Sequence, residues 1–327
     1  MNAPGGPDSA LTRVLADTLV TRGVLSFGFL DGIRLAGALE GVPAAVRGSY
    51  GLDSARGALA AALHYDTTGS PSGSLDEEYF RDRDGRPLAA LGWFARAHWY
   101  RELSDILAAA GRAAGLAAAG TRNSFRIAVN SRLPEKPLAL AAGLGPVGRN
   151  TLILERRAGP GCVLGVLILP FEPDPSAGTL SKHPGSPASG EPGSECGGCE
   201  ECVRACPTGA VRREGGIDRS LCLQHWAGAE GPVPPAIAEA WRGILYGCDL
   251  CLAACPRFRP GVVREASAGP LGRGLEPEAI LAARDPDLKS RFRGTALGLS
   301  WLGPSLIRRN ARLARDSRGK LHGSGQV

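Results

Sequence analysis

Eight of the nine cysteines in this 327-residue chain lie between residues 196 and 255. They form two related runs, Cys-x2-Cys-x2-Cys-x3-Cys-Pro beginning at Cys196 and Cys-x2-Cys-x3-Cys-Pro beginning at Cys248. Cys222 lies between the runs and completes two sets of four thiols. Four thiolates are the ligand set of a [4Fe–4S] cluster, and the longer run is the pattern of bacterial ferredoxins. The spacing therefore predicts two iron–sulfur clusters.

In the ferredoxin pattern the fourth cysteine of a run binds the other cluster. Three cysteines on a tight loop can surround one cluster, while a helical turn carries the fourth towards the second. Glycines beside the cysteines leave room for backbone amides to approach the sulfurs. Cluster one is then expected to take Cys196, Cys199, Cys202 and Cys255, and cluster two to take Cys206, Cys222, Cys248 and Cys251.

Zinc is the competing interpretation, because two Cys-x2-Cys pairs can form a four-thiolate zinc site. Eight thiols and two Cys-Pro ends exceed what one zinc ion needs. Disulfides are not expected, since the N-terminus MNAPGGPDSALTR shows no secretory signal and a cytoplasmic location is predicted. Cys162, alone in an apolar run, is expected to be an inert core residue.

A glycine segment at residues 143–148, GLGPVG, matches the G-x-G-x-x-G pattern of dinucleotide sites. Such a loop should open a helix and precede an acidic residue about 20 positions on. Here Pro146 interrupts the loop, Arg149–Leu154 reads as a strand, and the nearest candidate acid is Glu172. NAD or FAD binding is therefore not expected, although the loop could present N–H donors to another polar ligand.

The remaining sequence indicates a mixed α+β protein that holds these motifs. Its composition is ordinary for globular proteins, and no apolar run approaches the roughly 18–20 residues that span a bilayer. A helix over Ala10–Val20, capped by Ser9, is predicted, and residues 75–118 show long helical patterns. Residues 55–65 fit a strand or a helix. Strands are predicted at Val24–Leu30, Phe125–Val129, Thr151–Leu154 and Cys162–Leu169.

Four regions are expected along the chain. An α+β domain covers residues 1–170, and a linker rich in Pro, Gly and Ser covers 171–195. A ferredoxin-like domain covers 196–265, and a basic, mainly helical tail covers 266–327. The net charge is +6, with 34 of the 38 basic residues being arginine. This mild excess permits an RNA partner without requiring one, and the tail could equally be a solvated helix.

Together these segments resemble the epoxyqueuosine reductase family, cobalamin-dependent iron–sulfur enzymes of queuosine-tRNA synthesis that are related to reductive dehalogenases. The resemblance is carried by AGLGPVGRNTLIL at 142–154, CGGCEECVRACPTGAV at 196–211 and YGCDLCLAACP at 246–256. It implies that a low-potential donor passes electrons through two clusters to a corrinoid cobalt, which reduces the substrate. It also implies tRNA as a partner, with neither DNA nor a membrane involved.

The resemblance also implies roles for individual residues. The corrinoid would be lined by Gly143, Gly145, Gly148, Arg149, Asn150, Ile153, Leu164 and Gln224. The family's proton donor is an Asp at the position of Asn130, and an amide cannot act as a general acid. His98 is the candidate replacement. The cysteine runs match the family, whereas residues expected to face the substrate, such as Asn130, differ from it. Reduction of epoxyqueuosine itself is therefore not expected.

The sequence thus predicts an iron–sulfur oxidoreductase that resembles epoxyqueuosine reductase and uses a corrinoid on an unassigned substrate. Two alternatives stay open. One is a ferredoxin-like electron carrier without a corrinoid. The other is a non-catalytic RNA-binding or assembly protein in which the clusters are structural.

Overall fold

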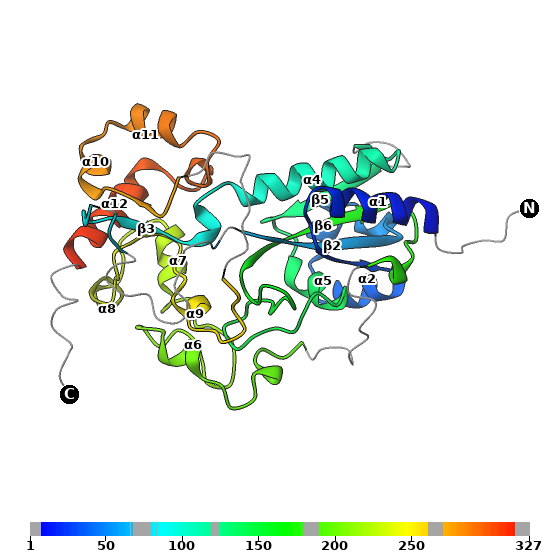
Figure 1. The fold of residues 1–327 in the computed structure, drawn as a ribbon, viewed down its shortest axis with the longest axis horizontal. Helices are drawn as coiled ribbons and strands as arrows, with labels where there is room; N and C mark the ends of the chain where they lie inside the picture. Colours follow the sequence, from blue (N-terminus) through cyan, green and yellow to red (C-terminus); the bar gives the residue numbers. More distant parts are fainter. Residues whose placement is uncertain are drawn as a thin grey trace, which may run out of the picture. The chain divides into compact units, whose positions relative to one another are not determined.

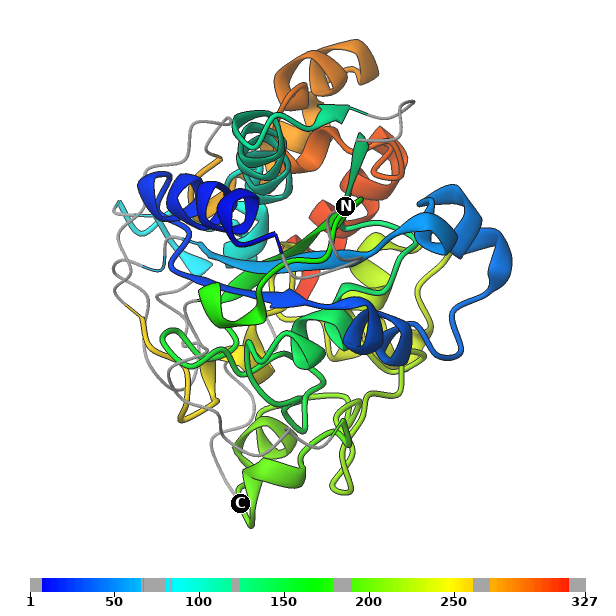
Figure 2. The ribbon, with the colours of Figure 1, turned by 90° about the vertical axis from the view of Figure 1, so that its right-hand side faces the viewer.

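The computed structural model describes residues 8–65, 67, 80–82, 84–118, 124–178, 190–260 and 271–317. The chain forms two compact units (Figures 1 and 2), each assembled from non-consecutive segments. Unit 1 comprises residues 1–64, 100–148 and 152–195, and unit 2 comprises 65–99, 149–151 and 196–327. The mixed α+β class predicted from the sequence is confirmed. The boundaries at residues 170, 195 and 265 remain predictions.

Unit 1 is built on a five-stranded sheet with the order β1-β2-β6-β5-β4. Neighbouring strands are antiparallel, except that β4 and β5 are parallel. The strands are β1 (Ser26–Leu30), β2 (Gly57–His64), β4 (Ala117–Ala118), β5 (Ser124–Val129) and β6 (Cys162–Leu169). Every residue of β2 is buried, so its sequence shows no polar alternation. The segment 55–65, open between strand and helix in the sequence, is therefore a central strand.

Helices cover both faces of this sheet (Figures 1 and 2), with α1 (Ser9–Thr21) and α4 (Trp99–Ala113) on one side. On the other side lie α2 (Gly32–Ala38) and α5 (Glu135–Ala141), and α3 (Ala44–Ser49) follows α2. The packing of α4 is close, because a Cβ at Gly111 would lie 2.7 Å from the ring of Phe125. The helices on the other face, α2 and α5, share a hydrophobic core with the sheet. This core includes Leu35, Ala58, Ala60, Leu138 and Val166.

Some predicted elements needed correction. The cap of α1 is Asp8 rather than Ser9, because its carboxylate accepts the N–H of Leu11 at 3.1 Å. The prediction of long helices over residues 75–118 is right only for α4. The same stretch contains two short strands, β3 (Ala89–Leu91) and β4. Strands of two or three residues are too short to show a period. Residues 75–79 lie outside the described part.

Unit 2 contains a small sheet with the order β7-β3-β8, in which β7 is Ile244–Tyr246 and β8 is Gly274–Leu275. Strand β3 is parallel to β7 and antiparallel to β8. The α-helices of unit 2 are α6 (Glu201–Arg204), α7 (Leu223–Gly228), α8 (Pro235–Glu239), α9 (Leu250–Ala253), α10 (Pro277–Ala282), α11 (Asp285–Phe292) and α12 (Pro304–Asp316). In the described ranges, no helix has the length and apolarity needed to cross a bilayer.

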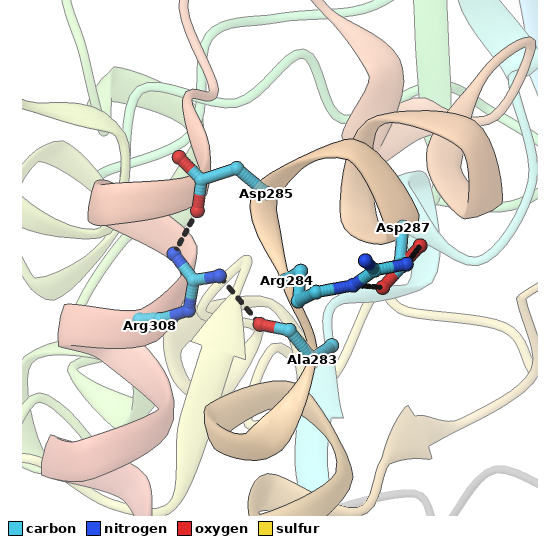
Figure 3. Close-up of polar contacts among 5 residues, drawn as sticks. All are labelled: Ala283, Arg284, Asp285, Asp287 and Arg308. Carbon is cyan, nitrogen blue, oxygen red and sulfur yellow. Dashed lines mark hydrogen bonds and ion pairs between the residues drawn. The ribbon is translucent and has the colours of Figure 1, made fainter.

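The helices predicted for the tail are present as α10, α11 and α12, but several of its arginines bind the protein itself (Figure 3). Arg308 of α12 pairs with the carboxylate of Asp285 and donates to the carbonyl of Ala283 at 2.6 Å. Arg284 donates to both carboxylate oxygens of Asp287, at 2.9 and 3.1 Å. The contacts of Arg308 tie α12 to the start of α11, and the pair Arg284–Asp287 stabilises the first turn of α11.

Glu155 is the centre of a buried polar cluster in unit 1. It directly follows residues 149–154, the run after the glycine segment. Its side chain accepts hydrogen bonds from Ser26 Oγ at 2.6 Å and His64 Nε2 at 2.7 Å. It also accepts the backbone N–H groups of Arg157 and Ala158, both at 2.9 Å. Burial raises the pKa of Glu155, but the hydrogen bonds from His64, Ser26 and Ala158 outweigh burial and bring the pKa to about 2.

Cys162 begins β6 and faces His64 across the antiparallel pair β2–β6. Burial raises the pKa of the Cys162 thiol, and the negative charge of Glu155 raises it further. A thiol in this environment stays protonated and is a poor nucleophile. This agrees with the inert core role expected from the sequence.

Removing the carboxylate of Glu155 should destabilise unit 1. Glu155→Ala leaves four donors without an acceptor, three of them buried, and we expect the free energy of unfolding to fall by about 3 kcal/mol or more. Glu155→Gln keeps an acceptor and should cost less. Both are measured by urea unfolding followed by far-UV circular dichroism at pH 7.

The stabilisation from the Glu155 carboxylate should also depend on pH in a defined direction. Its pKa is lowered from 4.5 to about 2, so its contribution is complete above about pH 4.5. It is lost as the pH falls towards 2. The gap in unfolding free energy between wild type and Glu155→Gln should therefore shrink below pH 4.5. A gap that stays constant down to pH 2.5 would contradict the lowered pKa.

Candidate iron–sulfur centre and cofactor site

The first cysteine run is a chain of tight turns that leads into α6. Cys199 N–H donates to the Cys196 carbonyl at 3.1 Å, with Gly197 between them at φ +54°. Helix α6 carries Cys202, and the N–H of Cys206 donates to the Val203 carbonyl at 3.2 Å. The run therefore presents Cys196 and Cys199 from the tight turns before α6, Cys202 from the helix itself and Cys206 just after it, so the third thiol lies on the helix and not on the loop that the spacing predicts.

The second cysteine run follows β7 and is positioned by a close glycine contact. Gly247 has φ +94°, and a Cβ there would lie 2.7 Å from the backbone of Gly92. Cys248 comes next, α9 carries Cys251, and Cys255 follows the end of that helix. Asp249 lies between Cys248 and Cys251, and its carboxylate accepts the N–H of Trp93 at 2.6 Å.

The thiols fall into two electrostatic groups. Burial, together with the neighbouring thiols of Cys255, Cys196 and Cys199, raises the pKa of Cys202 to about 11. Burial also raises the pKa of Cys248 and Cys251. For Cys248 and Cys251, the thiols of Cys222 and Cys206 raise the pKa further, and for Cys251 the thiol of Cys202 does so as well. Most of these neighbours lie within one set of the crossed assignment, which groups Cys196, Cys199, Cys202 and Cys255 in one set and Cys206, Cys222, Cys248 and Cys251 in the other. The individual ligands stay a prediction.

This donor set fits iron–sulfur clusters better than a single metal ion. Within the described ranges, no three His, Cys, Asp or Glu side chains converge closely enough to hold one metal ion. A zinc ion holds its sulfurs about 2.3 Å from one centre, whereas a four-iron cluster holds them further apart. Thiols with raised pKa values lose their protons when a metal binds the thiolate. Eight thiols in two sets of four suit two clusters.

Arg149 and Asn150 bind the backbone of both cysteine runs. Arg149 donates from Nη2 to the Gly197 carbonyl at 2.9 Å and from Nε to the Cys199 carbonyl at 3.2 Å. Asn150 is 2% exposed and donates from Nδ2 to the Cys251 carbonyl at 3.1 Å. The sequence did not predict these contacts. They make the pair part of the scaffold around the clusters, and their corrinoid role stays a prediction.

The glycine segment forms a hairpin rather than opening a helix. Val147 and Ile153 form an antiparallel bridge, and the N–H of Leu154 donates to the Pro146 carbonyl at 2.9 Å. A Cβ at Gly145 would lie 2.2 Å from the Leu154 carbonyl, so this glycine is required by the hairpin itself. The helix N-terminus that a dinucleotide site needs is thus missing from this segment.

The strand predicted at Thr151–Leu154 is wrong, because Thr151 adopts φ +61° at the turn. A β-branched residue in this left-handed region is uncommon, and such strain is often found at functional sites. No pattern in the sequence indicates this turn, since Thr, Leu and Ile all favour strands.

A pocket of about 440 Å³ lies beside Cys222, a predicted ligand of cluster two. Its wall also includes the strained Thr151 and Gln224, whose Oε1 accepts the N–H of Cys248 at 3.1 Å. Arg219 and His225 add polar groups to the wall. The pocket therefore joins a cluster ligand to several hydrogen-bonding side chains in a space typical of small-molecule sites, about 300–1,000 Å³.

The eight residues expected to line a corrinoid are divided between the two units. Arg149, Asn150 and Gln224 belong to unit 2, and Gln224 alone among them lines the pocket beside Cys222. The others belong to unit 1, where Ile153 is buried in the core beneath the sheet and Leu164 packs against that core. Those in unit 1 are Gly143, Gly145, Gly148, Ile153 and Leu164. Their ligand roles remain predictions.

Asn130 follows β5 directly, is exposed, and has φ +49°. A carboxyl group lies in the same loop: Glu135 Oε1 accepts the N–H of Ser131 at 3.0 Å. Burial raises the pKa of Glu135, and hydrogen bonds from Ser131 and Asn130 oppose that rise without cancelling it. The sequence analysis missed this carboxyl. His98, the other candidate acid, is half-buried in unit 2.

Comparison with known proteins supports the iron–sulfur assignment. Residues 195–257 match the family described as a 4Fe-4S double cluster binding domain. The chain is 32% identical over 184 residues to the epoxyqueuosine reductase of Listeria monocytogenes, covering 55% of this chain and 44% of that protein. It is 31% identical over 235 residues to that of Staphylococcus aureus, covering 68% and 56%. The chain thus spans about half the length of these curated relatives.

The fold agrees with these similarities. The structure of epoxyqueuosine reductase from Streptococcus thermophilus matches with a TM-score of 0.70 at 21% identity, covering 93% of this chain and 80% of that one. In sequence and in fold the chain is similar to epoxyqueuosine reductases. Its residues 195–257 form a binding domain for two [4Fe–4S] clusters, as the cysteine spacing predicts.

The crossed assignment makes a specific prediction for Cys222. Cys222→Ser should impair cluster two and spare cluster one, lowering bound iron from about eight to about four atoms per chain. Iron and sulfide analysis of anaerobically purified protein, with EPR of the reduced form, measures this. Cys162→Ser is the control and should keep the full complement. Zinc without sulfide in the wild-type protein would contradict both clusters.

Proposed function

We propose that this protein is an iron–sulfur oxidoreductase that passes electrons through two [4Fe–4S] clusters to a corrinoid bound beside cluster two. The observation that carries the proposal is the pocket whose wall includes Cys222, a ligand of cluster two. The clusters would supply single electrons, and the corrinoid would supply a low-valent cobalt able to reduce a substrate. The relatives named epoxyqueuosine reductase support the reaction class, which is reduction.

The chain's own residues would hold and orient these groups. Cys222 would serve both as a cluster ligand and as part of the pocket wall, which keeps the path from cluster to cofactor short. Gln224 fixes the Cys248 backbone and faces the same pocket. Arg219 and Thr151 provide donors for polar groups at the edge of a bound cofactor. A pocket of this size would accommodate part of a cofactor as large as a corrinoid.

We further propose tRNA as the macromolecular partner. One structural neighbour, an epoxyqueuosine reductase solved with an epoxyqueuosine-modified tRNA stem loop, matches with a TM-score of 0.68 at 23% identity. Arg308 and Arg309 bind the protein itself, whereas Arg291, Arg293 and Arg312 are exposed and suited to phosphate. Binding of tRNA that weakens steeply with salt and weakens further in an Arg291/Arg293/Arg312→Ala variant would support this partner.

Cobalamin should bind to the anaerobic protein and change its visible spectrum. Ala229→Trp should block binding, because Ala229 lines the pocket without being a cluster ligand. Ala236→Trp, at an exposed position of α8, is the matched control and should bind normally. Gly145 is unsuitable as a probe, since any side chain there disrupts the hairpin. If wild type gives no spectral change in either redox state, the electron-carrier alternative replaces the corrinoid proposal.

The protein should show little or no turnover of epoxyqueuosine tRNA. Opening an epoxide reductively leaves an oxygen that must be protonated, and a positioned acid contributes about 10²–10⁴-fold to such a step. Asn130 cannot supply the proton. Asn130→Asp should raise the rate if the pocket admits the substrate, as measured in an anaerobic assay with cobalamin and a low-potential reductant.

Robust wild-type turnover would contradict this prediction and show that another group supplies the proton. Glu135→Gln and His98→Ala would then identify the donor. Glu135 is tested first, because it shares a loop with Asn130 and its pKa is raised. Failure of both wild type and Asn130→Asp, with corrinoid bound, would favour a different substrate.

A further inference from the structure

One polar residue of α12 is buried on the helix's apolar face. The buried positions are Leu306, Ile307, Asn310, Ala311 and Ala314, which recur at helical spacing. Asn310 has no exposed surface. A buried amide is costly unless its hydrogen-bonding groups are paired, so the partners of Asn310 show what this position does.

The side chain of Asn310 links two separate segments of unit 2. Its Nδ2 donates to the carbonyls of Ala227 and Leu245, both at 2.8 Å. Its Oδ1 accepts from Arg309 Nε at 3.1 Å and from Arg309 Nη2 at 2.8 Å. Both amide hydrogens are thus used on backbone carbonyls that are 18 positions apart in the sequence.

These two segments carry ligands of cluster two. Ala227 lies in α7, which begins directly after Cys222. Leu245 lies in β7, which ends two residues before Cys248. Gln224 adds a second link, because its Oε1 accepts the Cys248 N–H at 3.1 Å. We call the segments that carry these two ligands the Cys222 arm (Cys222 and α7) and the Cys248 arm (β7 to Cys248). The distance between the two arms is therefore set by Asn310, which joins α7 to β7, and by Gln224, which bonds to the backbone of Cys248.

Neighbours of Asn310 reinforce the same arrangement. Arg309 donates to the carbonyls of Trp226 at 2.6 Å and Ala229 at 2.7 Å, which closes the C-terminal end of α7. A helix of six residues is unstable by itself, so its unpaired carbonyls need such partners. Ser317 Oγ accepts the N–H of Gly243 at 3.0 Å, which fixes the start of β7 to the end of α12.

We propose that Asn310 is a positioning residue for cluster two. By holding α7 and β7 together, it sets the separation of Cys222 from Cys248, and Arg309 supports it. Groups behind the direct ligands commonly tune a metal site in this way. The inference rests on the two-cluster part of the proposed function and is independent of the corrinoid and of tRNA.

The test compares the two cluster signals in an EPR-monitored redox titration of the anaerobic full chain. Cys222→Ser identifies the signal of cluster two. Asn310→Leu has a similar side-chain volume but no hydrogen bonds, and leaves the Ala227 and Leu245 carbonyls unpaired. It should shift the midpoint potential of that signal, or lower bound iron from about eight to about four atoms. Ser305→Ala, at an exposed position of the same helix, is the control and should leave both signals unchanged.

The outcomes separate this proposal from the function it rests on. If Cys222→Ser does not affect one signal selectively, the cluster assignment fails. If it does, but Asn310→Leu changes neither signal or both equally, the positioning role is overturned. Should Asn310→Leu not fold, Arg309→Gln decides, because it keeps the hydrogen bonds from Asn310 Nδ2 to the Ala227 and Leu245 carbonyls and weakens only the contacts of Arg309 with the end of α7 and with Asn310 Oδ1. It should produce a smaller change confined to the cluster-two signal, and an equal change in both signals would overturn the proposal.

Discussion

The structure of unit 2 depends on bringing eight thiols from three separated stretches of chain into two sets of four. Burial raises the pKa of Cys202, Cys248 and Cys251, so these thiols do not ionise readily by themselves. Only a cation that binds the thiolate offsets the cost of burying its charge. The backbone must therefore be held in place around the cysteines by groups that are not ligands.

Those groups come from distant parts of the sequence. Arg149 and Asn150 hold the backbone of the two cysteine runs, and Asp249 holds the second run to residues 92–93 through the Trp93 N–H. Asn310 joins the arms that carry Cys222 and Cys248. In each case a side chain bonds to backbone atoms, which fixes ligand position without competing for the metal. Because backbone groups are the partners, the ligand-bearing segments tolerate changes in their own side chains.

The sequence was most informative where spacing alone determines chemistry. The cysteine runs predicted two clusters, and β6 was predicted with its observed bounds because Cys162–Leu169 is a long apolar run before a proline. The turn at Thr151 could not be predicted, because its left-handed backbone contradicts the preference of threonine. The roles of Glu155 and His64 also depend on contacts between segments that are 91 positions apart. Asn310 did leave a signal, as an amide within an apolar helical stripe.

The use of α12 as a support also has a consequence for synthesis of the chain. Asn310 is about 60 positions after Cys251, so all eight cluster ligands leave the ribosome before the residue that joins their arms. At about 5–20 residues per second, the interval is roughly 3–12 s. During that time α7 and β7 have no link through α12, and the Cys222 and Cys248 arms are free to separate. Insertion of cluster two is thus favoured after α12 has emerged, which places it late in the biogenesis of the protein.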